Sequence, residues 1–210
     1  MASEKMKKEY ADMIAASKKK WDGRSSEFKE VWKAGLTRKV GGFLGWWDTL
    51  KELEKKFNNL YVWKIAEEVR YQSAFAHGQR LARNYKKHGL KELYDAFLGA
   101  YVGVGDYEFL EFNDEICSLK MHVDPYLPNF TAAGRTESEI KEMAPYFWLW
   151  WPGVISGFNP QFESFVPVRL IMKGDSYTGI HVADRLPPSS KGVHRLTGQV
   201  RGPWMPYMKH

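Results

Sequence analysis

The fold class of this chain can be approached from one stretch, GFNPQFESFVPVRLIMKGDSYTGIHVADRL, residues 157–186. Its two halves read as β-strands separated by the turn sequence KGDSY. Gly174 and Asp175 in that turn both tolerate the unusual backbone angles of a tight connection. The sequence therefore predicts a β-hairpin here, although the first hundred residues of the chain have a helical pattern.

Two earlier segments can pair with this hairpin. YEFLEFN (residues 107–113) and EICSLKMHV (residues 115–123) alternate apolar and polar side chains, and Asn113 and Asp114 between them suit a turn. We expect the hairpin to complete a small antiparallel sheet with these strands. The predicted fold class is α+β, with a helical N-terminal part followed by a small antiparallel sheet packed against a long helix.

Helical periodicity extends over most of the remaining chain. We expect one helix that begins at Thr136, because Thr136 and Glu139 form a capping-box pattern, and Pro145 should kink or split it. The other helices are predicted over residues 3–20, from Ser25 or Ser26 to Trp32, within the glycine-led segment 39–59, over 60–88 with Gly89 as the closing residue, and over 90–103.

The chain divides by pattern into three parts. Residues 1–60 form a predicted helical extension, residues 61–186 the α+β domain, and residues 187–210 a tail rich in Pro and Gly. The extension has too many apolar residues for a free segment, so it should pack on the core or on a second copy. A homo-oligomer is therefore expected.

Composition restricts the class of protein. The chain has 210 residues, 44% of them hydrophobic, with nine Trp, one Cys and a net charge of +6. It shows no secretory leader, membrane-spanning run or nucleic-acid-binding motif, and its basic runs are typical of solvated helix faces. We expect a cytoplasmic protein without a membrane or nucleic-acid partner.

Three segments resemble a known family. They are AHGQRLARNYKKHG (residues 76–89), GFNP (157–160) and GDSY (174–177). Their order and spacing from about Ile65 to Leu186 resemble the L-2-amino-thiazoline-4-carboxylic acid hydrolase family. The resemblance implies cleavage of a small cyclic amidine-like acid by an enzyme that depends on cysteine.

Both family cysteines are replaced in this chain. Asp124 stands before Pro125 where family members often have Cys, and Thr178 stands after Tyr177 where they often have the second. Cys117 lies seven residues before Asp124 and does not substitute for either. The sequence therefore predicts chemistry without a thiol.

Asp124 and His122 are the predicted catalytic residues. They are two positions apart on a predicted strand, so they should share a face, and the carboxylate could orient the imidazole for general acid/base work. The alternative reading is a polar strand face near solvent.

Further side chains are predicted to bind the substrate. An arginine on the long helix could pair with a substrate carboxylate, and the Trp-rich run 147–151 favours a planar or aromatic molecule. Regular alternation makes Thr178 face the core and His181 the opposite side, so both would line one pocket only if a bulge intervened. The predicted binding residues are Tyr71, His77, Arg80, Trp148, Trp151, Tyr177, Thr178 and His181.

The predicted function is an enzyme of hydrolase or lyase type that acts on a small, planar or aromatic organic molecule. Its partner is that small-molecule substrate, and no cofactor is expected. His122, Asp124, His181 and Asp184 are metal-ligand types, but no established metal-site spacing supports them, and no metal is predicted. Two alternatives stay open: a non-catalytic binding module that kept the fold, and a scaffold protein.

Overall fold

A computed structural model describes residues 4–57, 61–164, 167 and 169–184. Within this part of the chain, long helices precede and surround a small sheet. The helices are α1 (Glu4–Asp22), α2 (Ser26–Phe57), α3 (Tyr61–Ala82), α4 (Leu90–Leu93), the π-helical turn η1 (Tyr94–Leu98), α5 (Gly99–Val104), α6 (Leu127–Ala132), α7 (Glu137–Trp148), α8 (Trp150–Phe158) and the 3-10 turn η2 (Ile171–Lys173).

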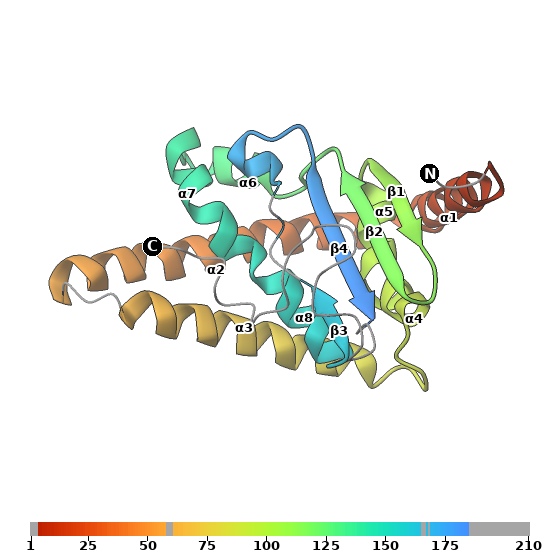
Figure 1. Ribbon diagram of the computed structural model, residues 1–210. Helices are drawn as coiled ribbons and strands as arrows, with labels where there is room; N and C mark the ends of the chain where they lie inside the picture. The colour runs from red at the N-terminus through yellow and green to blue at the C-terminus, as the bar shows by residue number, and fades with distance from the viewer. Residues whose placement is uncertain (1–3, 58–60, 165–166, 168, 185–210) are drawn as a thin grey trace.

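The sheet has four antiparallel strands in the order β1-β2-β4-β3. They are β1 (Tyr107–Phe112), β2 (Ile116–Met121), β3 (Phe162–Ser164) and β4 (Thr178–Asp184). The predicted α+β fold class is confirmed, and so is the pairing of the last strand with the strand over 116–121. Figure 1 shows the sheet toward one end of the molecule, while the last turns of α2 and the first turns of α3 lie toward the other end.

The predicted hairpin pairs as expected, but its connection is not a tight turn. Phe162 pairs with Asp184 and Ser164 with Val182, and the chain makes the turn η2 before β4 begins. Gly174 follows η2 with a φ of 95°, a left-handed conformation that favours glycine. Asp175 holds this loop, because its Oδ2 accepts a hydrogen bond from the backbone N–H of Leu170 at 2.9 Å.

Regular alternation separates the two faces of the sheet. The inner face carries Cys117, Leu119 and Met121 from β2 opposite Val182, Ile180 and Thr178 from β4, all of them buried. Lys120 lies on the outer face and its Nζ is 3.2 Å from Glu108 Oε2 on β1. The prediction that Thr178 and His181 lie on opposite faces is confirmed.

The helix boundaries differ from the sequence prediction in two places. Residues 26–57 form one continuous helix, although two helices separated near the glycines were expected. A methyl group added at Gly35, Gly41, Gly42 or Gly45 would meet nothing within 4 Å, so these glycines are tolerated in an exposed helix face. The helix continues because the residues between them form one buried stripe: Val40, Phe43, Leu44, Trp47 and Leu50. The second difference is that α3 ends at Ala82, and Gly89 precedes α4 rather than closing α3.

Helices α3 and α8 pack against each other through small residues. A methyl group added at Gly78 would lie 2.0 Å from the carbonyl oxygen of Val154, and one at Gly157 would lie 2.0 Å from that of Phe75. The two backbones therefore approach closely only because these positions lack a side chain. Gly78 therefore serves the close packing of α3 on α8.

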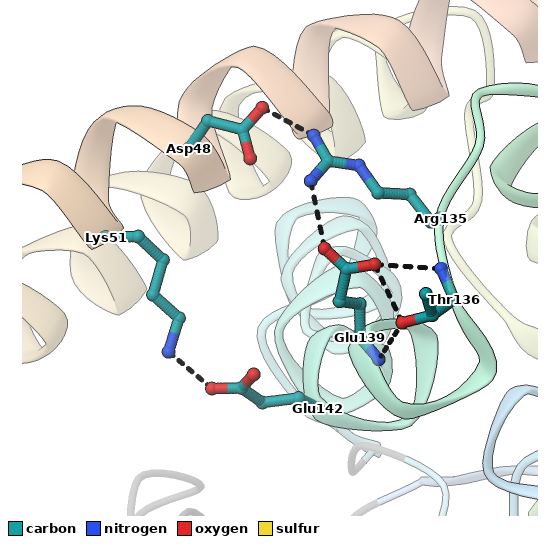
Figure 2. A network of polar contacts seen from close by, with 6 residues as sticks. All are labelled: Asp48, Lys51, Arg135, Thr136, Glu139 and Glu142. Carbon is teal, nitrogen blue, oxygen red and sulfur yellow. Dashed lines mark hydrogen bonds and ion pairs between the residues drawn. The ribbon is translucent and has the colours of Figure 1, made fainter.

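Helix α7 begins at the predicted cap and is tied to α2. Thr136 Oγ1 accepts a hydrogen bond from the backbone N–H of Glu139, and the Glu139 carboxylate accepts one from the Thr136 N–H at 2.8 Å. Figure 2 shows Arg135 between this carboxylate and Asp48 of α2, and Lys51 of α2 paired with Glu142.

The predicted N-terminal extension packs on the rest of the chain. The buried stripe of α2 belongs to the same hydrophobic core as Trp63, Phe130 and Phe147, and α1 lies against α5. The predicted tail, residues 187–210, lies outside the described residues. Among the helices that the structure describes, none is long and apolar enough to cross a membrane.

Candidate functional site

Asp124 lies just after the sheet, at the beginning of α6. Its Oδ1 accepts hydrogen bonds from the backbone N–H groups of Tyr126 at 2.8 Å and Leu127 at 3.2 Å, so the carboxylate holds the turn that leads into this short helix. The residue is only 3% exposed. Burial raises the pKa of Asp124 to about 6, even though the two amide donors, Trp148 and Lys39 act in the opposite direction.

His122 does not share a face with Asp124. Strand β2 ends at Met121, so the alternation that the sequence suggested stops before either residue. His122 is exposed, and its Nε2 lies 3.4 Å from Glu108 Oε2 on the outer side of the sheet, whereas Asp124 is buried. The structure therefore separates the predicted catalytic pair.

Lys39 of α2, and not His122, is the titratable group whose charge acts on Asp124. Its Nζ donates a hydrogen bond to the hydroxyl of Tyr126 at 3.1 Å and lies 3.4 Å from the ring centroid of Trp150. Burial lowers the pKa of Lys39 well below its usual range; the nearby Arg70 charge lowers it further, and the Asp124 charge opposes the shift. Sequence analysis missed this residue.

The spacing of apolar residues around Lys39 is the sequence signal that points to it. Trp32, Leu36 and Phe43 lie seven and three residues before it and four residues after it, which places all four on one stripe of α2. A lysine within an apolar stripe is a polar group directed at the interior. The prediction failed because the glycines suggested a helix break at this point.

Two tyrosines extend the polar contacts from Lys39. The hydroxyls of Tyr101 and Tyr126 are 2.8 Å apart, and burial raises the pKa of both phenols. Trp148 Nε1 and Asp124 Oδ2 are both buried, and within the described residues neither atom has a hydrogen bond of good geometry. The indole N–H of Trp148 nevertheless favours the charged carboxylate and so lowers the pKa of Asp124. We call Lys39, Tyr101, Asp124, Tyr126 and Trp148 the interior polar cluster.

Aromatic rings and one more cation surround the interior polar cluster. Trp151 stacks on Trp148 with ring centroids 5.1 Å apart and an interplanar angle of 28°. The Arg70 guanidinium is buried and donates to the backbone carbonyls of Tyr146 and Phe147 at 2.7 and 2.8 Å. Burial lowers the pKa of Arg70 to about 9. The cluster therefore lies in a low-dielectric environment where charges interact strongly.

His77 lies at the edge of this arrangement. Its ring centroid is 5.2 Å from that of Trp150, and its pKa is lowered by burial and by the Arg80 and Lys39 charges. Arg80 is exposed, with its guanidinium 3.5 Å from His77 Nδ1. Tyr71 lies next to Gly153, where α3 packs on α8.

The remaining predicted residues lie elsewhere on the sheet. Tyr177 is near the outer-face Lys120, whose Nζ is 5.3 Å from its ring centroid, and His181 also lies on the outer face. Thr178 is fully buried, and its Oγ1 accepts a hydrogen bond from the backbone N–H of Ile171 at 3.0 Å. Of the predicted site residues, the structure thus brings Asp124, Trp148, Trp151 and His77 to one region. Over the described part of the chain, no three His, Cys, Asp or Glu side chains gather as a metal site.

Comparison with known proteins adds little to this site. No family model matches the chain, and no curated protein matches it. A solved structure, trafficking protein particle complex subunit 3 from Naegleria fowleri covalently bound to palmitic acid, is similar over 71% of this chain and 96% of that protein. The identity is 11% and the TM-score 0.47, values that assign this chain neither a family nor a function.

Proposed function

We propose that this protein is an enzyme of hydrolase or lyase type that acts on a small, planar or aromatic organic molecule by acid/base chemistry without a thiol. The observation that carries the proposal is the interior polar cluster, in which the buried carboxyl of Asp124 and the half-buried amine of Lys39 interact among aromatic rings. A carboxyl with a pKa of about 6 can exchange a proton near neutral pH more efficiently than an ordinary aspartate.

Within this proposal, Asp124 is the proton acceptor or donor. The backbone amides of Tyr126 and Leu127 occupy its Oδ1, so Oδ2 is the oxygen that would exchange the proton. Lys39 is the group that would bind an acidic substituent of the substrate, and the ring of Trp150 beside it would contact a planar ring.

The partial exposure of several side chains supports access from solvent. Lys39, His77, Tyr101 and Trp150 are each half-buried, and they come from four different helices. A small molecule that displaced water from these side chains would reach the hydroxyl pair of Tyr101 and Tyr126. Substrate binding at this edge is part of the proposal.

The state of the single cysteine supports a mechanism without a thiol. Cys117 is 0% exposed, and burial raises the pKa of its thiol to about 12, so it would be protonated at neutral pH. A relationship to the L-2-amino-thiazoline-4-carboxylic acid hydrolase family stays part of our proposal; it rests on the segments at residues 76–89, 157–160 and 174–177.

The test is a turnover screen against small cyclic carboxylic acids, with and without ring nitrogen or sulfur. For a compound that is consumed, Asp124→Asn should lower turnover by about 10²–10⁴-fold. Asp114→Asn, in the exposed turn between β1 and β2, removes a carboxylate of the same kind and should leave turnover unchanged. Full activity of Asp124→Asn would show that this residue is not the acid/base group.

A second candidate function is a non-catalytic binding module. The observation that favours it is the pair of backbone hydrogen bonds to Asp124 Oδ1, which by itself explains why a carboxylate is buried just before α6. Calorimetry distinguishes the two candidates. Saturable binding of a compound that is never converted, weakened by Lys39→Met, supports the binding module.

We also propose a cytoplasmic homo-oligomer. Ile65 and Val69, four residues apart on α3, are 64% and 57% exposed, and such side chains suit a subunit contact. Light scattering should show an oligomer that Ile65→Glu with Val69→Glu converts to a monomer. A monomeric wild-type protein would contradict this part of the proposal.

A further inference from the structure

A groove on the surface lies apart from the interior polar cluster. It has a volume of about 770 Å³ and lies between α1, the beginning of α2 and the segment from α4 to α5. None of the five cluster residues lines it. Its size lies within the range of small-molecule sites in proteins.

The groove exists because α1 is held close to α5 while the side chains on its floor are small. A methyl group added at Gly103 would lie 2.7 Å from the carbonyl oxygen of Ser17, so the two helices touch there. Ser17 Oγ and the hydroxyl of Tyr94 share a hydrogen bond of 2.8 Å. Beside these contacts the lining includes Ala16, Gly99 and Ala100, which leave the hollow open.

One end of the groove is aromatic. Trp21 lies at its centre, with ring centroids 5.1 Å from Trp32 and 6.2 Å from Phe28. Phe28 is 42% exposed although it is a large apolar side chain. Both pairs meet edge to face at an interplanar angle of 68°, so the three rings give a ligand an apolar, angled surface at the junction of α1 and α2.

The same end is basic. The Arg24 guanidinium lies 4.8 Å from the ring centroid of Phe28, and Lys20, in the last turn of α1, also lines this end. The acidic lining residues of α1, Glu9 and Asp12, are at least eight residues away from Lys20, about 12 Å along the helix. Lys91 and Asp95 also line the groove and balance each other in charge.

We propose that this groove binds a planar aromatic anion, with its ring against Trp21 and Phe28 and its carboxylate or sulfonate beside Lys20 and Arg24. This end of the groove supplies two interactions: aromatic contact with a ring, and a guanidinium that can pair with an acidic group. The site is separate from the proposed acid/base site and does not depend on it.

Two fluorescent probes with the same rings test the proposal. Anilinonaphthalene sulfonate carries an acidic group, and phenylnaphthylamine is its uncharged counterpart. We expect one molecule of the sulfonate to bind the folded wild-type chain, about 10-fold more tightly than the amine, with energy transfer from Trp21 and Trp32. Equal affinity for the two probes, or several equivalent sites, would overturn the proposal.

Matched variants locate the probe. Lys20→Gln with Arg24→Gln should weaken sulfonate binding by about 5- to 10-fold, a modest effect because each exposed ion pair contributes little. The affinity for the uncharged amine should change by less than about twofold. Arg83→Gln with Lys86→Gln makes the same change in net charge outside the groove and should alter neither affinity. An equal effect of both double variants would mean that overall charge alone attracts the sulfonate.

Filling the groove is the second arm of the test. Ala100 is exposed and lines the groove, so Ala100→Phe can occupy it without disturbing the core. This variant should weaken both probes by about 10-fold or more, and Ala16→Phe on the facing helix should do the same. Unchanged affinity in both variants, with wild-type thermal midpoints, would place the probe elsewhere and refute the site.

Discussion

The Nζ of Lys39 lies 3.4 Å from the ring centroid of Trp150, and both side chains are half-buried at the edge of the aromatic interior. An ammonium group above an indole ring is a favourable contact, but removing it from water has a cost that lowers the pKa of Lys39. The balance of these two effects makes this residue the most informative position for mutation.

Replacing Lys39 with Met tests that balance. The pKa of the lysine is lowered by folding, so the unfolded chain binds more protons than the native state below the ordinary lysine range. The wild-type protein should therefore gain stability relative to Lys39→Met as the pH rises from 7 toward 10. Urea unfolding at several pH values measures this. Parallel profiles for the two proteins would mean that Lys39 titrates as an exposed lysine.

Asp124 should show a pH dependence of the opposite sign. Its pKa is raised by folding from 3.8 to about 6, so between these values the native state binds more protons than the unfolded chain. Its contribution to stability is complete below about pH 4 and is lost as the pH rises through about 6. From pH 4 to about pH 6, the free energy of unfolding of the wild-type protein should fall by roughly 1–3 kcal/mol relative to that of Asp124→Asn. A constant difference between the two from pH 4 to 7 would contradict the raised pKa.

The contact between α3 and α8 should not accept a side chain. Gly157→Ala would place a methyl group 2.0 Å from the Phe75 carbonyl oxygen, and forcing the backbones apart should cost about 1–3 kcal/mol or more. Gly42→Ala, in the exposed face of α2, is the control and should stabilise by about 0.5–1 kcal/mol because alanine favours a helix. Thermal unfolding of both variants checks the pair.

The ion pair between Arg135 and Asp48 should contribute little to the free energy of unfolding. The Asp48 side chain is 53% exposed, and solvent and salt screen such pairs. A double-mutant cycle with Arg135→Ala and Asp48→Ala should give a coupling of about 0.2–1 kcal/mol that decreases at high salt. A larger, salt-independent coupling would indicate that the pair of Figure 2 is buried in solution.

Local signals in the sequence predicted several features that the structure confirms. The capping box of Thr136 and Glu139 starts α7, and alternation along β4 separates Thr178 from His181. These features depend on neighbouring residues or on a short period, so the sequence carries them directly.

The candidate site depended on contacts between distant segments. The end of β2 at Met121 is fixed by its pairing with β1 and β4, and it separates His122 from Asp124. Lys39 reaches Tyr126 across 87 positions of the chain. Propensity and periodicity are local, so the sequence predicted most of the helical and extended segments, although not all of their boundaries. Which charges lie together in the interior depends on contacts between distant segments, and the pKa of a buried group depends on what folding places around it.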